Sequence, residues 1–146
     1  FVSIVVKKMK ALNNISLIAP CGMNCGLCMA YLRKKDKCSG CRAADSEKRH
    51  SCVRCSIVRC ETFRDGKKKY CYQCEKFPCA RIRQLDKRYR SKYHMSMIEN
   101  LENIKESGIR KFVESENARW ACASCGGTIC VHRPDCLTCG RKVIFK

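Results

Sequence analysis

Cysteine is the residue type through which this chain could do chemistry. Sixteen of its 146 residues are cysteine, and twelve of these form Cys-x-x-Cys pairs. The pairs are Cys25/Cys28, Cys38/Cys41, Cys52/Cys55, Cys71/Cys74, Cys122/Cys125 and Cys136/Cys139. Two intervening residues let both sulfurs of one turn point at a single ion, whereas a disulfide within such a pair closes a small, strained ring. The spacing therefore predicts several metal centres.

The last two pairs predict the most specific single site. A glycine follows each pair, at Gly126 and Gly140, and relaxes the turn so that backbone N–H groups can reach the sulfurs. This pattern is typical of a zinc ribbon or a rubredoxin-like site, in which four thiolates hold tetrahedral zinc, or iron in the same geometry. Cys130 and His132 lie in the intervening loop. They could form part of another site or replace one ligand, and a solvated loop histidine is the alternative for His132.

The remaining cysteines precede residue 80 and allow more than one pairing. One pairing gives a site of Cys38, Cys41, Cys52 and Cys55, a second of Cys60, Cys71, Cys74 and Cys79, and a triad of Cys21, Cys25 and Cys28. Interleaved pairings are equally allowed. The triad resembles the cluster motif of radical S-adenosylmethionine enzymes, but the chain is too short for their large α/β barrel. The triad could hold a [4Fe–4S] cluster for electron transfer or sensing, or a distant cysteine, His50 or His132 could complete it.

Composition indicates why the chain would need metal. Apolar residues reach 45% only because cysteine is counted, so the remaining apolar content is modest. Short chains of this kind need disulfides or bound metals for stability. The apolar stretch of residues 1–6 precedes Lys7 and Lys8, the reverse of the order in a signal peptide. No run reaches the length of a membrane span. We therefore expect reduced thiolates on metal in the cytoplasm, with Met9 as a candidate start.

The chain is strongly basic, with a formal net charge of +18. Four metal–tetrathiolate sites would lower this to about +10, and part of the basic excess would stabilise those anionic centres. The remainder predicts an acidic partner, either nucleic acid or protein. The candidate contact residues are Lys67, Lys68, Lys69, Arg81, Arg83, Lys87, Arg88, Arg90 and Lys92. Tyr89 and Tyr93 alternate with the last of them, as suits phosphate contact with base stacking; the alternative is a solvated helix face.

Residues 80–120 contain no cysteine and predict the helices that position the metal sites. Apolar spacing indicates helices beginning near Ile82 and Ile109, and Ser96 with Glu99 forms a capping box for another that ends at Gly108. We expect a small, metal-stapled α+β or irregular fold: an N-terminal multi-knuckle cysteine-rich region, central helices and C-terminal zinc-ribbon-like hairpins. The expected parts are a multi-metal domain over 19–85, a helical connector over 86–120 and a ribbon or rubredoxin-like module over 121–146.

Four cysteine motifs occur in a specific order. They read Cys21-Gly-Met-Asn-Cys25-Gly-Leu-Cys28, Cys38-Ser-Gly-Cys41, Cys52-Val-Arg-Cys55-Ser-Ile-Val-Arg-Cys60 and Cys71-Tyr-Gln-Cys74-Glu-Lys-Phe-Pro-Cys79. Together they resemble a prokaryotic cysteine-rich metal-binding family catalogued as domain of unknown function 3795, in its longer subgroup with a C-terminal zinc ribbon. The resemblance covers residues 19 to about 85, with Met23 in place of the usual Leu. It implies metal binding in a cytosolic, often anaerobic setting, and it implies no established activity.

These observations favour a non-enzymatic, cysteine-rich protein with several zinc ions that contacts an acidic partner through its basic surface. The alternative is an iron–sulfur protein with a redox or sensing cluster at Cys21, Cys25 and Cys28. A metal-handling or cluster-carrier role is a third interpretation. No glycine-rich phosphate loop or isolated pair of carboxylates points to catalysis.

Overall fold

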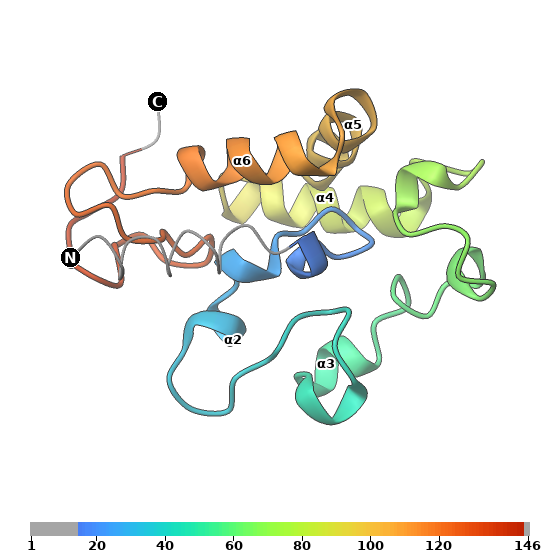
Figure 1. The fold of residues 1–146 in the computed structure, drawn as a ribbon, viewed down its shortest axis with the longest axis horizontal. Helices are drawn as coiled ribbons and strands as arrows, with labels where there is room; N and C mark the ends of the chain where they lie inside the picture. The colour runs from blue at the N-terminus through green and yellow to red at the C-terminus, as the bar shows by residue number, and fades with distance from the viewer. Residues whose placement is uncertain (1–14, 145–146) are drawn as a thin grey trace.

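Three helices form the main scaffold of the structure, a computed structural model that describes residues 15–144. They are α4 (Ala80–Lys92), α5 (Met97–Ser107) and α6 (Ile109–Arg119), and α5 packs against both of the others. Figure 1 shows α4 and α6 running along one side of the cysteine-rich segment. The predicted helices are therefore present. The candidate start at Met9 lies outside the described residues.

Short turns make up most of the chain before α4. They are η1 (Ile15–Leu17), η2 (Cys25–Leu27), α2 (Met29–Leu32), η3 (Asp45–Glu47), α3 (His50–Val53), η4 (Glu61–Phe63) and η5 (Cys71–Gln73). Two of these turns, η2 and η5, begin at the first cysteine of a Cys-x-x-Cys pair. Each element is at most four residues long, too short to be a stable helix in isolation. The segment therefore depends on contacts made by its side chains.

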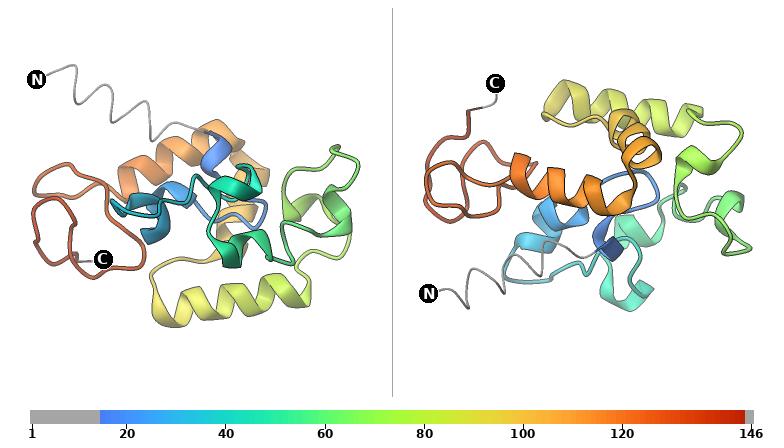
Figure 2. Two further views of the ribbon diagram at one scale, coloured as in Figure 1. Left: turned by 90° about the horizontal axis from the view of Figure 1, so that it is seen from below. Right: turned by 45° about the horizontal axis from the view of Figure 1, so that its top comes forward.

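The fold is helix-rich and has less β-structure than the α+β expectation implied. Within residues 15–144, β-pairing is confined to isolated bridges between Ile18 and Asn24, Ala121 and Thr128, and Asp135 and Lys142. The zinc-ribbon hairpins expected at the C-terminal end therefore do not form strand ladders in the described part of the chain. The C-terminal loops lie at one end of the molecule, and the loops approaching residue 79 lie at the other (Figures 1 and 2).

Helix α5 is fixed at both ends by capping interactions. The Ser96 Oγ accepts a hydrogen bond of 3.1 Å from the Glu99 N–H, and Gly108 ends the helix with a φ of +87°. Asp86 of α4 adds a contact that the sequence did not predict. Its buried carboxylate accepts hydrogen bonds from the Ser96 hydroxyl (2.6 Å) and the Ile98 N–H (3.1 Å). This carboxylate therefore ties α4 to the start of α5.

The cysteine-rich segment docks directly on α5. The Asn100 side-chain amide donates a hydrogen bond of 3.0 Å to the Gly22 carbonyl. Gly22 has a φ of +88°, and a Cβ there would lie 3.0 Å from Leu101 Cγ. Only glycine fits both the backbone conformation and the close approach to α5. The turn between Cys21 and Cys25 is thus held against the helices.

One carboxyl group in this scaffold is buried without full hydrogen bonding. Glu116 of α6 is 4% exposed, and its Oε2 atom has no hydrogen-bond partner among the described residues. Burial raises the pKa of this carboxyl from its usual value near 4.5 to about 7, although Arg119 opposes the shift. Between these two values the folded chain retains a proton that the unfolded chain releases. The free energy of unfolding therefore falls as the pH rises through this window.

Replacing Glu116 by Gln should remove this pH dependence. Between pH 5.5 and 7.5, we expect the wild-type chain to lose about 1–2 kcal/mol of unfolding free energy relative to Glu116→Gln. Chemical denaturation at constant salt measures the difference, and Glu114→Gln, an exposed change on the same helix, should behave like the wild type. Parallel pH profiles for the wild type and Glu116→Gln would contradict this account.

Candidate metal centres

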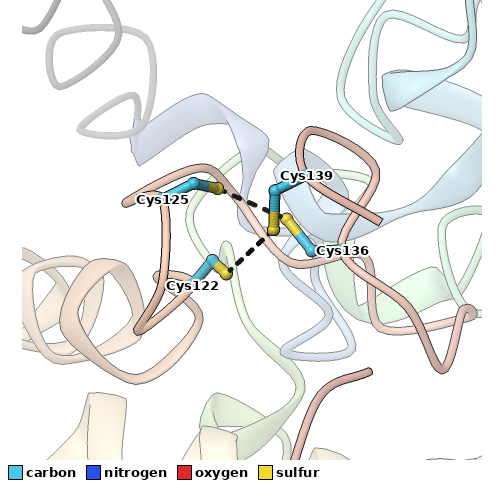
Figure 3. Close-up of side chains that lie close together, drawn as sticks. All are labelled: Cys122, Cys125, Cys136 and Cys139. Carbon is cyan, nitrogen blue, oxygen red and sulfur yellow. Dashed lines mark hydrogen bonds between the residues drawn. The ribbon is translucent and has the colours of Figure 1, made fainter. Parts of the chain in front are cut away.

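The four C-terminal cysteines form a compact site. The Sγ atoms of Cys122, Cys125, Cys136 and Cys139 all lie within 4.8 Å of one another. Cys122 is 3.8 Å from Cys139, and Cys125 is 3.6 Å from Cys136, with all four side chains converging in Figure 3. Tetrahedral zinc with bonds of about 2.3 Å places its sulfur ligands about 3.8 Å apart. The distances between the four sulfurs therefore match those between the ligands of a single tetrahedral ion.

Two equivalent turns build this quartet. The Gly126 N–H donates to the Cys122 carbonyl, and the Gly140 N–H donates to the Cys136 carbonyl, each at 2.8 Å. The two glycines have φ values of +72° and +75°, a conformation that favours glycine. The glycine after each pair, singled out in the sequence, thus closes each turn as expected.

The thiols of the quartet differ in how readily they ionise. Backbone N–H groups, that of Cys139 first, lower the pKa of Cys136 to about 6, and those of Cys125 and Ser124 lower the pKa of Cys122. The Gly127 N–H acts in the same direction on Cys125, but burial and the neighbouring thiols raise its pKa to about 11. Two thiolates are therefore favoured while further ionisation is resisted. A divalent cation at the centre would remove this resistance, because it neutralises the charge that the sulfurs share.

A second predicted set lines one small cavity. Cys60, Cys71, Cys74 and Cys79 surround a space of about 30 Å³. The Thr62 hydroxyl lies between two of them, 3.5 Å from Cys60 Sγ and 3.4 Å from Cys74 Sγ, and lowers the pKa of both thiols. Burial, followed by the neighbouring cysteines, raises the pKa of Cys71. The structure thus places these four residues around a space large enough for a single small ion.

The other two predicted sets merge into one N-terminal thiol cluster. It contains the triad of Cys21, Cys25 and Cys28 and the predicted site of Cys38, Cys41, Cys52 and Cys55. The 38–41 turn lies against Cys25, because a Cβ on Gly40 would be 3.7 Å from Cys25 Cβ. The adjoining Cys25 thiol, together with burial, raises the pKa of Cys41. Burial, with Cys41 next, raises the pKa of Cys52 to about 11. Cys41 therefore lies between the triad and the site predicted beside it, which agrees with interleaved pairing rather than with separate sites.

The N-terminal thiols are more widely spaced than the quartet. Across residues 15–144, the quartet is the one group of three or more cysteine, histidine or carboxylate residues whose ligand atoms all approach within 4.8 Å. Single-ion coordination needs that spacing, whereas the ligands of an iron–sulfur cluster bond to different iron atoms and stand further apart. The spacing of the sulfur atoms thus separates the C-terminal quartet, which is close enough to share one ion, from the N-terminal thiols, which are further apart.

The loop residues Cys130 and His132 lie away from the quartet. His132 Nδ1 accepts a hydrogen bond of 3.2 Å from the Met29 N–H, and its Nε2 lies 3.0 Å from the Tyr89 hydroxyl. Because Nδ1 is an acceptor, Nε2 carries the proton of the neutral ring and donates a hydrogen bond to the Tyr89 hydroxyl. Cys130 is fully buried, with its Sγ 4.0 Å from Met29 Sδ. Both side chains therefore join the C-terminal loop to α2, and the solvated-histidine alternative is wrong.

The candidate polyanion contacts are exposed, but their tyrosines are not free to stack on bases. All nine lysines and arginines proposed for this role have exposed side chains. Tyr89 hydrogen-bonds to His132, and the Tyr93 ring meets the His132 ring edge-on at 4.8 Å. Arg90 is also engaged, through an ion pair of 2.9 Å with Asp86. Helix α4 therefore offers cations without an available stacking surface.

Arg42 has a role that no motif or spacing indicated. Its Nε donates to the Ile18 carbonyl (2.7 Å) and its Nη2 to the Lys69 carbonyl (2.6 Å). The guanidinium also lies 4.9 Å from the centre of the Tyr70 ring. Arg42 therefore connects three separate segments beside Cys41.

Comparison with known proteins identifies one relationship. A family model described as a protein of unknown function (DUF3795) matches residues 17–84. No curated protein and no solved structure matches the chain. None of the described helices combines the length and apolar character needed to cross a membrane.

Changing one quartet cysteine should remove one ion. In Cys136→Ser, we expect the metal content to fall by about one ion per chain, because three thiolates hold the ion far less tightly than four. Elemental analysis of the purified protein measures this loss. Cys130→Ser is the matched control, since Cys130 is equally buried in the same loop but contacts Met29. Loss of an ion from Cys130→Ser, or its retention in Cys136→Ser, would show that the site is assigned to the wrong residues.

Proposed function

We propose that this chain, which belongs to the DUF3795 family over residues 17–84, is a non-enzymatic multi-metal thiolate protein that binds an acidic partner. The C-terminal quartet is the observation that carries the proposal. Four converging sulfurs, two of them with a lowered pKa, suit one tetrahedral ion. A site closed by four thiolates leaves no position open for a substrate, so its role is structural.

Zinc is the ion that best fits the quartet. Zinc favours tetrahedral thiolate coordination and imposes no redox chemistry, although iron can occupy the same geometry. None of the sixteen cysteines forms a disulfide. Free thiols of this number fit a reducing compartment, which supports a cytoplasmic location.

The merged N-terminal thiols support a second candidate, an iron–sulfur centre that includes Cys21, Cys25 and Cys28. Their wider spacing favours a polynuclear centre over a single ion. Burial raises the pKa of Cys21 to about 12, so this thiol needs a strong positive charge nearby to ionise. Iron with matching inorganic sulfide in anaerobically purified protein would favour this candidate, and zinc alone would favour the structural one.

The acidic partner is proposed from the distribution of charge. Residues 29–94 contain 20 basic and 7 acidic side chains, and the salt bridges of the described residues engage only a few of the cations. The cations of α4 and of the 67–69 run are exposed. Such a surface attracts a polyanion by releasing its counterions, and the affinity then falls steeply with salt.

Binding of metal-loaded protein to heparin and to single-stranded RNA tests this proposal. We expect log K to fall linearly with log salt, with a slope corresponding to about four or more phosphate contacts. The matched comparison is a basic protein of similar size and net charge. Elution of the chain at no higher salt than that protein would contradict a specific acidic partner.

A further inference from the structure

An open pocket of about 340 Å³ lies beside the N-terminal thiol cluster. Its wall includes four cationic residues, Arg42, Lys48, Lys68 and Lys69, and no acidic residue. Cys41, which adjoins Cys25, also forms part of the wall. The pocket therefore combines a positive lining with a fixed position next to a candidate metal centre.

Two of the four cations are held in place by the protein itself. Lys48 Nζ donates to the Cys41 carbonyl (3.2 Å) and pairs with Asp45 (3.3 Å), leaving its side chain only 4% exposed. Arg42 is fixed by its bonds to the Ile18 and Lys69 carbonyls. These side chains give the pocket a positioned basic wall, because neither can move without losing these hydrogen bonds.

The other two cations are available to a ligand. Lys68 and Lys69 have exposed side chains, and no carboxylate within residues 15–144 forms a salt bridge with either of them. Arg42 holds the Lys69 carbonyl, so the backbone that carries the two ammonium groups is positioned as well. Two unpaired ammonium groups on an anchored segment form a suitable contact for a phosphate group.

The pocket lining also has an apolar part. Phe63, Val58 and Pro20 contribute to it, and Phe63 and Val58 are partly exposed. A carboxylate-bearing protein would need only the cations, whereas a nucleotide presents both a phosphate and a flat base that packs on an aromatic ring. The volume lies at the small end of ligand pockets, roughly 300–1,000 Å³, which suits one nucleotide and excludes a duplex. These features favour single-stranded nucleic acid.

We infer that this pocket binds one nucleotide unit of a single-stranded nucleic acid, with Lys68 and Lys69 on the phosphate and Phe63 against the base. The inference rests on the proposed function, because it assigns the acidic partner and one of its contact sites. It also moves the base-stacking role from Tyr89 and Tyr93, which pack on His132, to Phe63.

Fluorescence anisotropy with a labelled oligo-uridine tests the inference on the metal-loaded full chain. We expect Lys68→Ala/Lys69→Ala to weaken binding about tenfold, and the matched control Lys34→Ala/Lys35→Ala, a pair of exposed lysines elsewhere, to weaken it less than about threefold. We expect Phe63→Leu to weaken oligo-uridine binding at least fivefold, about the loss of one stacked base, and to leave polyphosphate binding unchanged.

The other possible results would each exclude one feature of the proposed binding site. Equal losses of oligo-uridine affinity in the two double-lysine variants would show that the pocket is not the binding site, although the chain would still bind an acidic partner. Equally tight binding of poly-glutamate, with no effect of Phe63→Leu, would overturn the nucleotide assignment in favour of an acidic protein. Absence of binding to every polyanion would overturn both proposals. Phe63 also lines the cavity of Cys60 and Cys74, so metal content is measured for that variant, and the lysine variants decide the test if it loses metal.

Discussion

Repulsion between neighbouring thiolates is the constraint on which this structure depends. Four sulfurs lie within 4.8 Å of one another in the C-terminal quartet, and the environment favours ionisation at Cys122 and Cys136 while opposing it at Cys125. Ionisation is opposed at Cys41 as well, where the Cys25 thiol and then burial raise the pKa, and at Cys71, where burial and then neighbouring thiols raise it. Such arrangements become favourable when a cation is shared among the sulfurs. We therefore expect metal coordination to be the interaction that makes this arrangement of the chain stable.

The rest of the fold is consistent with that dependence. The segment before α4 consists of elements too short to persist alone, and its buried side chains include Cys21, Cys25 and Cys71. Apolar packing contributes as well: one buried core includes Met97 and Leu101 of α5 together with Ile18 and Leu27 of the cysteine-rich segment. We expect metal centres to add to this core, because the apolar content of so short a chain is modest. Two parts of the chain far apart in sequence, around Leu27 and Val131, are joined by a backbone hydrogen bond of 3.0 Å.

Local features of the sequence were the predictable ones. The spacing of the quartet and the glycines after its pairs are contained within 19 residues, and the capping residues of α5 lie within a few positions of the helix. The family resemblance was confirmed over residues 17–84. The merging of Cys25 with Cys41 depends on how one turn lies against another, and the contact between His132 and Met29 spans 103 positions. Tertiary packing determines such contacts, and no local pattern encodes them. The domain boundaries proposed from the sequence stay a prediction.

Reversible removal of metal from reduced protein tests whether coordination holds this fold together. Trp120 is the sole tryptophan of the chain, is 1% exposed and lies two residues before Cys122, so its fluorescence reports on the core beside the quartet. We expect a chelator under anaerobic, reducing conditions to shift the Trp120 emission to the red and to lower the helical circular dichroism signal. We also expect zinc, or iron with sulfide, to restore both signals. A metal-free chain that keeps Trp120 buried and its helices intact would contradict the claim that coordination holds this fold together.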